Sequence, residues 1–95
     1  MTYNLIFLKS AKKEWDKLTP FIEKQFKNKL IERLENPRIP KDKLVGIADC
    51  YKIKLRASGY RLVYKIVDER VIVRVIEIGK RDKEAVYKLA HYRLT

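Results

Sequence analysis

The sequence contains very little cysteine, histidine or glycine. Its 95 residues include one cysteine, Cys50, and one histidine, His91. A single thiol excludes an internal disulfide and a cysteine-based metal site, and a single imidazole gives no basis for a histidine-based one. The three glycines, Gly46, Gly59 and Gly79, are isolated from one another. The chain therefore lacks a glycine-rich loop that could hold a phosphate, and we expect no metal and no cofactor.

Long apolar runs are also absent. No run approaches the ~20 residues that a membrane-spanning helix needs. The first four residues, Met1 to Asn4, show neither the basic nor the long apolar segment of a secretory signal. We therefore expect a cytoplasmic protein that does not bind a membrane. A chain of 95 residues is long enough for one core, so residues 1–95 are expected to form a single domain.

Acidic residues are scarce relative to basic ones. The chain has 23 lysines and arginines against 12 acids, a net charge of +11 and a pI near 9.9. Hydrophobic residues make up 46% and charged residues 37%, as in an ordinary folded domain. A folded protein with such an excess of positive charge usually binds nucleic acid or an acidic protein. A simple basic RNA-binding protein is one reading that composition alone supports.

The order of predicted elements indicates an α+β fold. Apolar periodicity and turn residues predict, in chain order, a strand over 3–8, helices over 11–18 and 20–35, a β-hairpin over 50–67, a strand over 71–78 and a helix over 83–93. This β-α-α-β-β-β-α order predicts a mainly antiparallel sheet with an N-terminal helical hairpin packed on one face.

The hairpin carries the most informative pattern. Polar and apolar residues alternate on both sides of Ser58-Gly59, which predicts two strands joined by a two-residue turn that places Arg56 opposite Arg61. The alternation puts five cations on one face, with no carboxylate between Asp49 and Asp68: Lys52, Lys54, Arg56, Arg61 and Lys65. Because directly opposed like charges destabilise a sheet, this face is predicted to bind a polyanion.

Five residues are candidates for catalysis. Lys52, Lys54 and Arg61 share the cationic face, Arg81 follows the next strand, and Tyr87 lies in the last predicted helix. If that helix folds back against the sheet, the five side chains converge on one pocket. Such a pocket suits RNA cleavage by the RNA's own 2′-hydroxyl. This reaction needs no protein nucleophile, and fixed cations stabilise the negative charge of its transition state.

The weak point of such a site is its base. A lysine amine has an ordinary pKa near 10.4 and must lose roughly 3 units to act as a base near neutral pH. Lys54 is well placed because Lys52 and Arg56 flank it and disfavour its charged form. Which of Lys52 and Lys54 acts stays open, since neighbouring amines titrate together. Holding the RNA in line for attack can contribute ~7–11 kcal/mol, so poor activity on free RNA is expected.

Three segments resemble RelE-type toxins of bacterial toxin–antitoxin modules. They are Lys43-Leu44-x-Gly46, the run from Cys50 to Tyr64, and Gly79-Lys80-Arg81. The resemblance implies a small curved antiparallel sheet with helices. It also implies a ribosome-dependent endoribonuclease that cleaves mRNA in the A site, leaves a 2′,3′-cyclic phosphate and a 5′-hydroxyl, and so inhibits translation.

The resemblance also implies roles for individual residues. Lys52 and Lys54 supply the base and electrostatic stabilisation, Arg61 and Arg81 stabilise the phosphorane or assist the leaving group, and Tyr87 stacks on a nucleotide. Supporting RNA contacts are expected from Arg56, Lys65 and Lys80. The expected partners are a cognate antitoxin, the ribosome and mRNA, with DNA reached only through the antitoxin. The alternative on the same scaffold is a non-catalytic, ParE-like gyrase inhibitor, which has no need for this set of cations.

Overall fold

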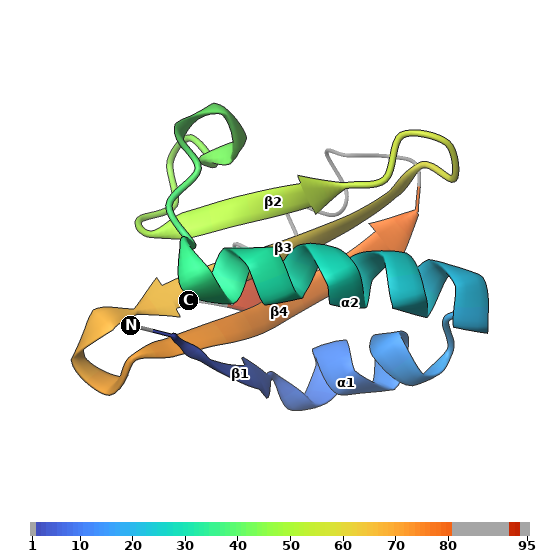
Figure 1. The fold of residues 1–95 in the computed structure, drawn as a ribbon, viewed down its shortest axis with the longest axis horizontal. Helices are drawn as coiled ribbons and strands as arrows, with labels where there is room; N and C mark the ends of the chain where they lie inside the picture. The colour runs from blue at the N-terminus through green and yellow to red at the C-terminus, as the bar shows by residue number, and fades with distance from the viewer. Residues whose placement is uncertain (1, 81–91, 94–95) are drawn as a thin grey trace.

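A computed structural model describes residues 2–80 and 92–93 of the chain. Figure 1 shows the following elements: β1 (Asn4–Phe7), α1 (Lys9–Asp16), α2 (Pro20–Glu35), the short 3-10 helix η1 (Pro40–Asp42), β2 (Cys50–Lys54), β3 (Tyr60–Val67), the 3-10 helix η2 (Asp68–Arg70) and β4 (Ile72–Lys80). The predicted α+β class and the order of these elements are confirmed. Most of the last predicted helix lies outside the described residues. None of the helices described here is both long and apolar enough to cross a membrane.

The four strands form one sheet in the order β1-β4-β3-β2. β2 pairs antiparallel with β3, and β3 antiparallel with β4. β1 instead runs parallel to β4, with Asn4 opposite Ile72 and Phe7 opposite Val75. The sheet is therefore mainly antiparallel, as predicted, and the first and last described strands are neighbours.

Local sequence fixes the ends of α2. The Thr19 hydroxyl accepts a hydrogen bond from the Ile22 amide at 3.4 Å, and Pro20 occupies the first turn, where its missing N–H costs nothing. Pro37 disfavours helical backbone at Asn36, where α2 ends. α1 begins and ends two residues earlier than predicted, at Lys9 and Asp16.

The main core lies between the helices and one face of the sheet. α2 crosses this inner face in Figure 1 and buries one stripe of apolar side chains against it, while α1 adds Ala11. The residues buried on the inner face of the sheet are Tyr51, Ile53, Leu55, Leu62, Tyr64, Ile66, Val73, Val75 and Ile78. The apolar face of the predicted hairpin is thus the floor of the core.

The hairpin register differs from the prediction by two residues. Lys54 lies opposite Arg61, and the Leu55 amide donates to the Tyr60 carbonyl, so the loop has four residues rather than two. A two-residue type I′ turn requires positive φ at both central positions, but only Gly59 adopts it, at 79°. Because an even shift keeps every side chain on its face, the predicted separation of charges from the core is confirmed.

The core of α2 gives a direct test of this packing. Leu30 is 1% exposed, whereas its neighbour Ile31 is 57% exposed. We expect Leu30→Ala to lower the free energy of unfolding by about 2–5 kcal/mol, because it removes apolar contacts and leaves a cavity. The matched control Ile31→Ala should cost less than about 1 kcal/mol. Urea denaturation measures both, and equal losses would contradict the placement of α2.

Candidate nucleic-acid interface

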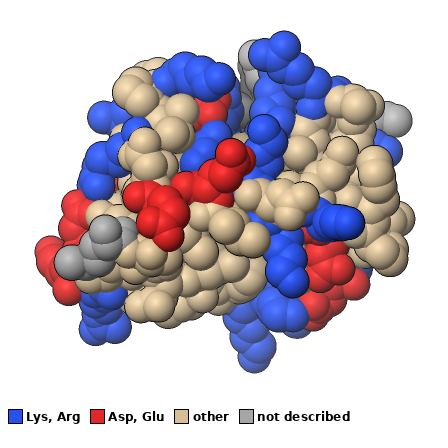
Figure 2. All heavy atoms as spheres, in the orientation of Figure 1, with Lys and Arg blue, Asp and Glu red and all other residues tan. Residues whose placement is uncertain are grey.

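The cationic face is the side of β2 and β3 that points away from the helices. It comprises Lys52 and Lys54 of β2 and Arg61 and Lys65 of β3, with Arg56 in the connecting loop. Lys54 and Arg61 are direct cross-strand partners, which brings their Cα atoms within about 4.5–5.5 Å. Figure 2 shows the opposite, helical side of the molecule, where lysines and arginines are interspersed with acidic side chains.

A basic groove of about 380 Å³ runs along the free side of β2. Three elements supply its six basic side chains and its one carboxylate: Lys29 and Arg33 from α2, Lys41 and Asp42 from η1, and Lys52, Lys54 and Arg56 from β2 and the loop after it. Sequence analysis did not identify the contributions of α2 and η1, because nothing in the order of residues brings them beside β2.

Arg33 holds the wall of this groove together. Its guanidinium donates to the Asp42 carboxylate at 2.6 Å, to the Lys52 carbonyl at 3.1 Å and to the Tyr64 hydroxyl at 2.8 Å. The Tyr64 hydroxyl in turn donates to the Pro37 carbonyl at 2.6 Å. Burial raises the pKa of Tyr64 above its ordinary value, so the phenol stays neutral. Arg33 thus fixes the backbone of Lys52, one of the two candidate bases.

The hairpin loop and the end of β4 meet at one end of the cationic face. Arg61 donates to the Gly59 carbonyl at 3.3 Å and pairs on its other side with Gly79 of β4. Lys80, opposite Tyr60, places its amine 5.5 Å from the centre of the Tyr60 ring. Tyr60 packs against the core, so Lys80 lies at the same end of the sheet as Arg61 but is directed toward the other face.

Of the five predicted catalytic residues, the structure brings three together. Lys52 and Lys54 lie on one strand, and Arg61 is the direct partner of Lys54 on the next. Arg81 follows Lys80 directly in the chain, but Arg81 and Tyr87 lie outside the described residues, as does His91. Their predicted convergence with the three cations stays a prediction.

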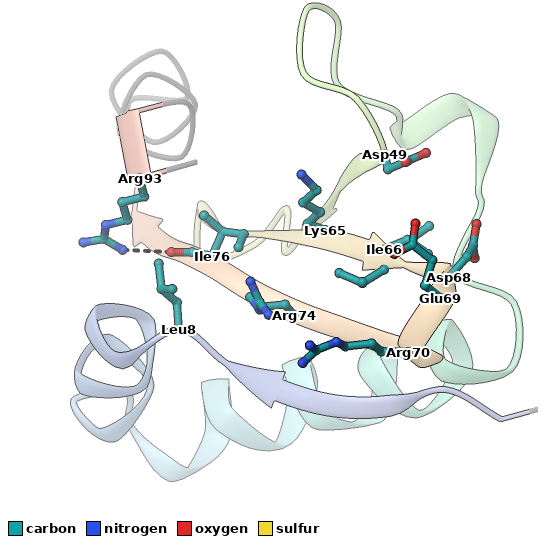
Figure 3. A pocket seen from close by; sticks show the side chains of 11 residues that line it. Leu8, Asp49, Lys65, Ile66, Asp68, Glu69, Arg70, Arg74, Ile76 and Arg93 are labelled. Carbon is teal, nitrogen blue, oxygen red and sulfur yellow. Dashed lines mark hydrogen bonds between the residues drawn. The ribbon is translucent and has the colours of Figure 1, made fainter. Parts of the chain in front are cut away.

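Lys65 lies apart from this group. It is four residues along β3 from Arg61, a separation of about 13 Å at ~3.3 Å per residue. It lines a second pocket of about 500 Å³ on the outer side of the sheet, where Figure 3 also shows Arg70 and Arg74. Its predicted role in RNA binding is therefore separate from the groove at β2.

The described residues supply neither a reactive thiol nor a cluster of metal ligands. Cys50 is fully buried, and burial raises the pKa of its thiol to about 11, so it is not poised as a nucleophile. Within residues 2–80 and 92–93, no group of histidine, cysteine or acidic side chains is arranged to hold a metal ion.

Comparison with known proteins identifies the family. The family model described as ParE toxin of the type II toxin–antitoxin system parDE matches residues 5–85. The mRNA interferase toxin RelE of Escherichia coli K12 is 54% identical over 94 residues, which cover 99% of both chains. The mRNA interferase RelE of Shigella flexneri is equally similar.

Solved structures agree with this relationship. A mutant of E. coli toxin RelE in the free state superposes with a TM-score of 0.91 at 53% identity, over all of both chains. The toxin in the intact E. coli RelBE toxin–antitoxin complex superposes with a TM-score of 0.82 at 56% identity, over 85% of this chain and 99% of that one. The chain therefore belongs to the RelE/ParE family of toxins of type II toxin–antitoxin systems.

The role of Arg33 can be tested by substitution. Arg33→Met should lower the free energy of unfolding by about 3 kcal/mol, because it leaves the half-buried Asp42 carboxylate without its cation and removes a hydrogen bond from Tyr64. Lys29→Met removes the same charge from an exposed position one turn earlier in α2 and should change stability by less than about 0.5 kcal/mol. Chemical denaturation compares the two, and a loss of similar size in both variants would contradict the proposed anchoring.

Proposed function

We propose that this protein is the toxin of a type II toxin–antitoxin module and that it inhibits translation by cleaving mRNA in the A site of the ribosome. The pairing of Lys54 with Arg61, beside Lys52, is the observation on which this proposal chiefly rests. The 54% identity to an mRNA interferase over nearly the whole chain supports it. The single main core supports treating residues 1–95 as one domain, and the bacterial relatives support a location in the cytoplasm.

The proposed reaction uses a nucleophile from the substrate. The 2′-hydroxyl attacks the adjacent phosphorus, and the bond from phosphorus to the 5′-oxygen breaks. The products are a 2′,3′-cyclic phosphate and a 5′-hydroxyl. The proton of the 2′-hydroxyl passes to the neutral amine of Lys52 or Lys54, and the 5′-oxygen leaves with its negative charge stabilised by the arginines and takes a proton from water. No metal or cofactor takes part in this scheme.

Cations supply the stabilisation of the transition state. The phosphorane carries more negative charge than the starting diester, so positive groups fixed around it bind it more tightly than the substrate. We assign this role to Arg61 and Arg81, with Tyr87 stacking on a nucleotide. Arg56 is a supporting RNA contact at the groove, whereas Lys65 and Lys80 lie outside it and would contact RNA beyond the cleavage site. Arg61 is suited to its role because the Gly59 carbonyl holds its guanidinium beside the loop.

The same cations favour a neutral amine at Lys54. Arg61 lies directly across the strand, and Arg56 follows two residues later, so each positive charge disfavours a further proton on the amine between them. A lysine is still a weak base, and the scheme contains no histidine. Alignment of the 2′-hydroxyl by the ribosome, which can contribute ~7–11 kcal/mol, is therefore required for useful rates.

The relatives also suggest the partners. E. coli RelE has been solved in complex with the antitoxin RelB, both as the intact complex and with a RelB peptide. We propose that a cognate antitoxin binds this chain in the same way. The remaining partners are the ribosome and mRNA, with DNA contacted only through the antitoxin.

A gyrase inhibitor is the second candidate, because the matching family model is described as ParE toxin. That function needs the fold but not a cluster of cations that can surround a phosphate. The two candidates differ in their targets. An assay of DNA supercoiling by gyrase therefore separates them from mRNA cleavage.

The test is cleavage of a defined mRNA with and without programmed ribosomes. We expect cuts confined to the A-site codon, and far slower cleavage of the free RNA. Arg61→Ala should lower the rate on ribosomes by about 10²–10³-fold, the usual effect of removing one transition-state donor, while ribosome binding changes only a few-fold. Arg70→Ala removes the same charge from an exposed position in η2 and should keep the wild-type rate.

Two outcomes would contradict the proposal. Intact mRNA together with inhibited gyrase would establish the second candidate. Equal rates for Arg61→Ala and Arg70→Ala would show that cleavage does not depend on the cationic face.

A further inference from the structure

β4 is longer than the strand beside it. Its pairing with β1 ends at Val75, whose carbonyl accepts from the Leu8 amide at 2.9 Å. Beyond Val75, side chains rather than a neighbouring strand bind the backbone groups on this edge of β4. The Ile78 amide donates to Glu14 Oε1 at 3.2 Å, and the Ile76 carbonyl accepts from Arg93 Nη1 at 2.9 Å, the dashed bond in Figure 3. This edge of β4 is thus closed by α1 and by the last described residues.

Arg93 binds Glu14 through both of its terminal nitrogens. Its Nη1 and Nη2 lie 3.0 and 3.4 Å from the two oxygens of the Glu14 carboxylate, a two-point contact. The two hydrogens on Nη1 are directed to Glu14 and to the Ile76 carbonyl. Glu77 Oε2 lies only 2.8 Å from the same nitrogen, yet it receives no hydrogen bond. Nη1 therefore faces two carboxyl groups and has a hydrogen for only one of them.

The surroundings of Glu77 make a second negative charge costly. Its side chain is 3% exposed, and that of Arg93 is 16% exposed. α1 contributes Glu14, and the chain end contributes Arg93. β3 contributes the buried Val63 directly opposite, with Arg61 and Lys65 two residues to either side. Two ionised carboxylates and one guanidinium would leave an uncompensated charge in this buried space, which favours a proton on Glu77.

We propose that Glu14, Glu77 and Arg93 form a proton-linked clamp that fastens residues 92–93 to the edge of β4 beyond its pairing with β1. With one proton shared between the two carboxyl groups, the cluster is electrically neutral. Loss of that proton leaves two negative charges around Arg93 and tightens the hold on its guanidinium. Because Gly79, two residues beyond Glu77, pairs with Arg61, the clamp also fixes the part of β4 that positions Arg61.

The causes that raise the pKa of Glu77 give the direction of the proton linkage. Burial first, and then hydrogen bonding to and repulsion by Glu14, raise the pKa of Glu77 to about 8, while Arg93 lowers it. Because proton linkage is reciprocal, Arg93, which favours the ionised form of Glu77, is bound more tightly once Glu77 is ionised. If the Glu77 midpoint differs by one pH unit with and without Arg93, the affinity for the Arg93 guanidinium differs tenfold between the two protonation states of Glu77.

NMR titration of the Glu77 carboxyl carbon in the full chain tests the proposal without reference to RNA cleavage. In the unmodified protein the midpoint should lie well above the ordinary 4.5. Glu14→Gln removes the negative neighbour and should lower the midpoint by more than one unit. Arg93→Met removes the cation and should raise it. Lys24→Met removes an exposed charge from α2 and should leave it unchanged.

Thermal unfolding gives a second test, which does not require the Arg93→Met variant to fold. The folded-state pKa of Glu77 is raised, so between pH 4.5 and about 8 the folded protein holds a proton that the unfolded chain has lost. Stability attributable to Glu77 is therefore lost as pH rises through this window. Glu77→Gln should show a smaller fall in Tm from pH 5 to 8 than the unmodified protein.

The clamp is refuted if Glu77 titrates near 4.5, or if Glu14→Gln raises its midpoint. It is also refuted if the Tm of Glu77→Gln falls as much as that of the unmodified protein. Each of these results would leave the proposed cleavage reaction standing, because none measures RNA. Loss of cleavage in Arg61→Ala would equally say nothing about the clamp.

Discussion

The structure depends on the burial of one face of α2 against one face of the β2–β3 hairpin. Phe26 and Leu30 of α2 are almost fully buried on Ile53, Leu62 and Tyr64, and successive side chains in a strand point to opposite faces. Once the inner face is apolar, the remaining positions must point outward. The lysines and arginines of the hairpin are therefore displayed together because of the packing of the core. A functional surface is fixed here by the same periodicity that fixes the fold.

Displaying these charges has a cost in stability. Lys54 and Arg61 are direct cross-strand partners of the same sign, and Lys65 is the direct partner of Arg74 on the next strand. The hydrogen bonds of Arg33 to η1, β2 and β3 offset part of this cost by tying the wall of the groove to α2. In the proposed function, an RNA phosphate between these strands offsets the repulsion of the paired like charges, so the site lies where the fold is less favourable.

Much of the fold could be predicted because it follows from periodicity. Strict alternation assigned Lys52 and Ile53 to opposite faces, and an even register shift preserved that assignment. The register itself could not be predicted, because Ser58-Gly59 fits several turn lengths and only the backbone conformation of Ser58 distinguishes them. The burial of Cys50 could not be predicted from the alternation, which places it on the face of Lys52, because Leu44, Val63 and Ile76 cover it there.

The parts of the site that depend on tertiary contact were missed. Arg33 is separated by 19 residues from the Lys52 carbonyl that it binds, and no local signal connects them. Glu77 did leave a signal, since an acidic residue inside an otherwise β-branched strand rarely lies there without a partner. Glu14 lies 64 positions from Ile78 and 79 from Arg93, and Arg93 lies 17 from Ile76, so the cluster itself required the structure.

The parallel pairing of β1 with β4 has a consequence for biosynthesis. Residues 4–7 find their hydrogen-bonding partners only at residues 72–75, so the N-terminal strand stays unpaired until most of the polypeptide has left the exit tunnel. β4 is also the neighbour that completes β3, which carries Arg61. The strand that is synthesised first is therefore among the last to join the sheet, whereas the β2–β3 hairpin pairs within one short stretch of chain.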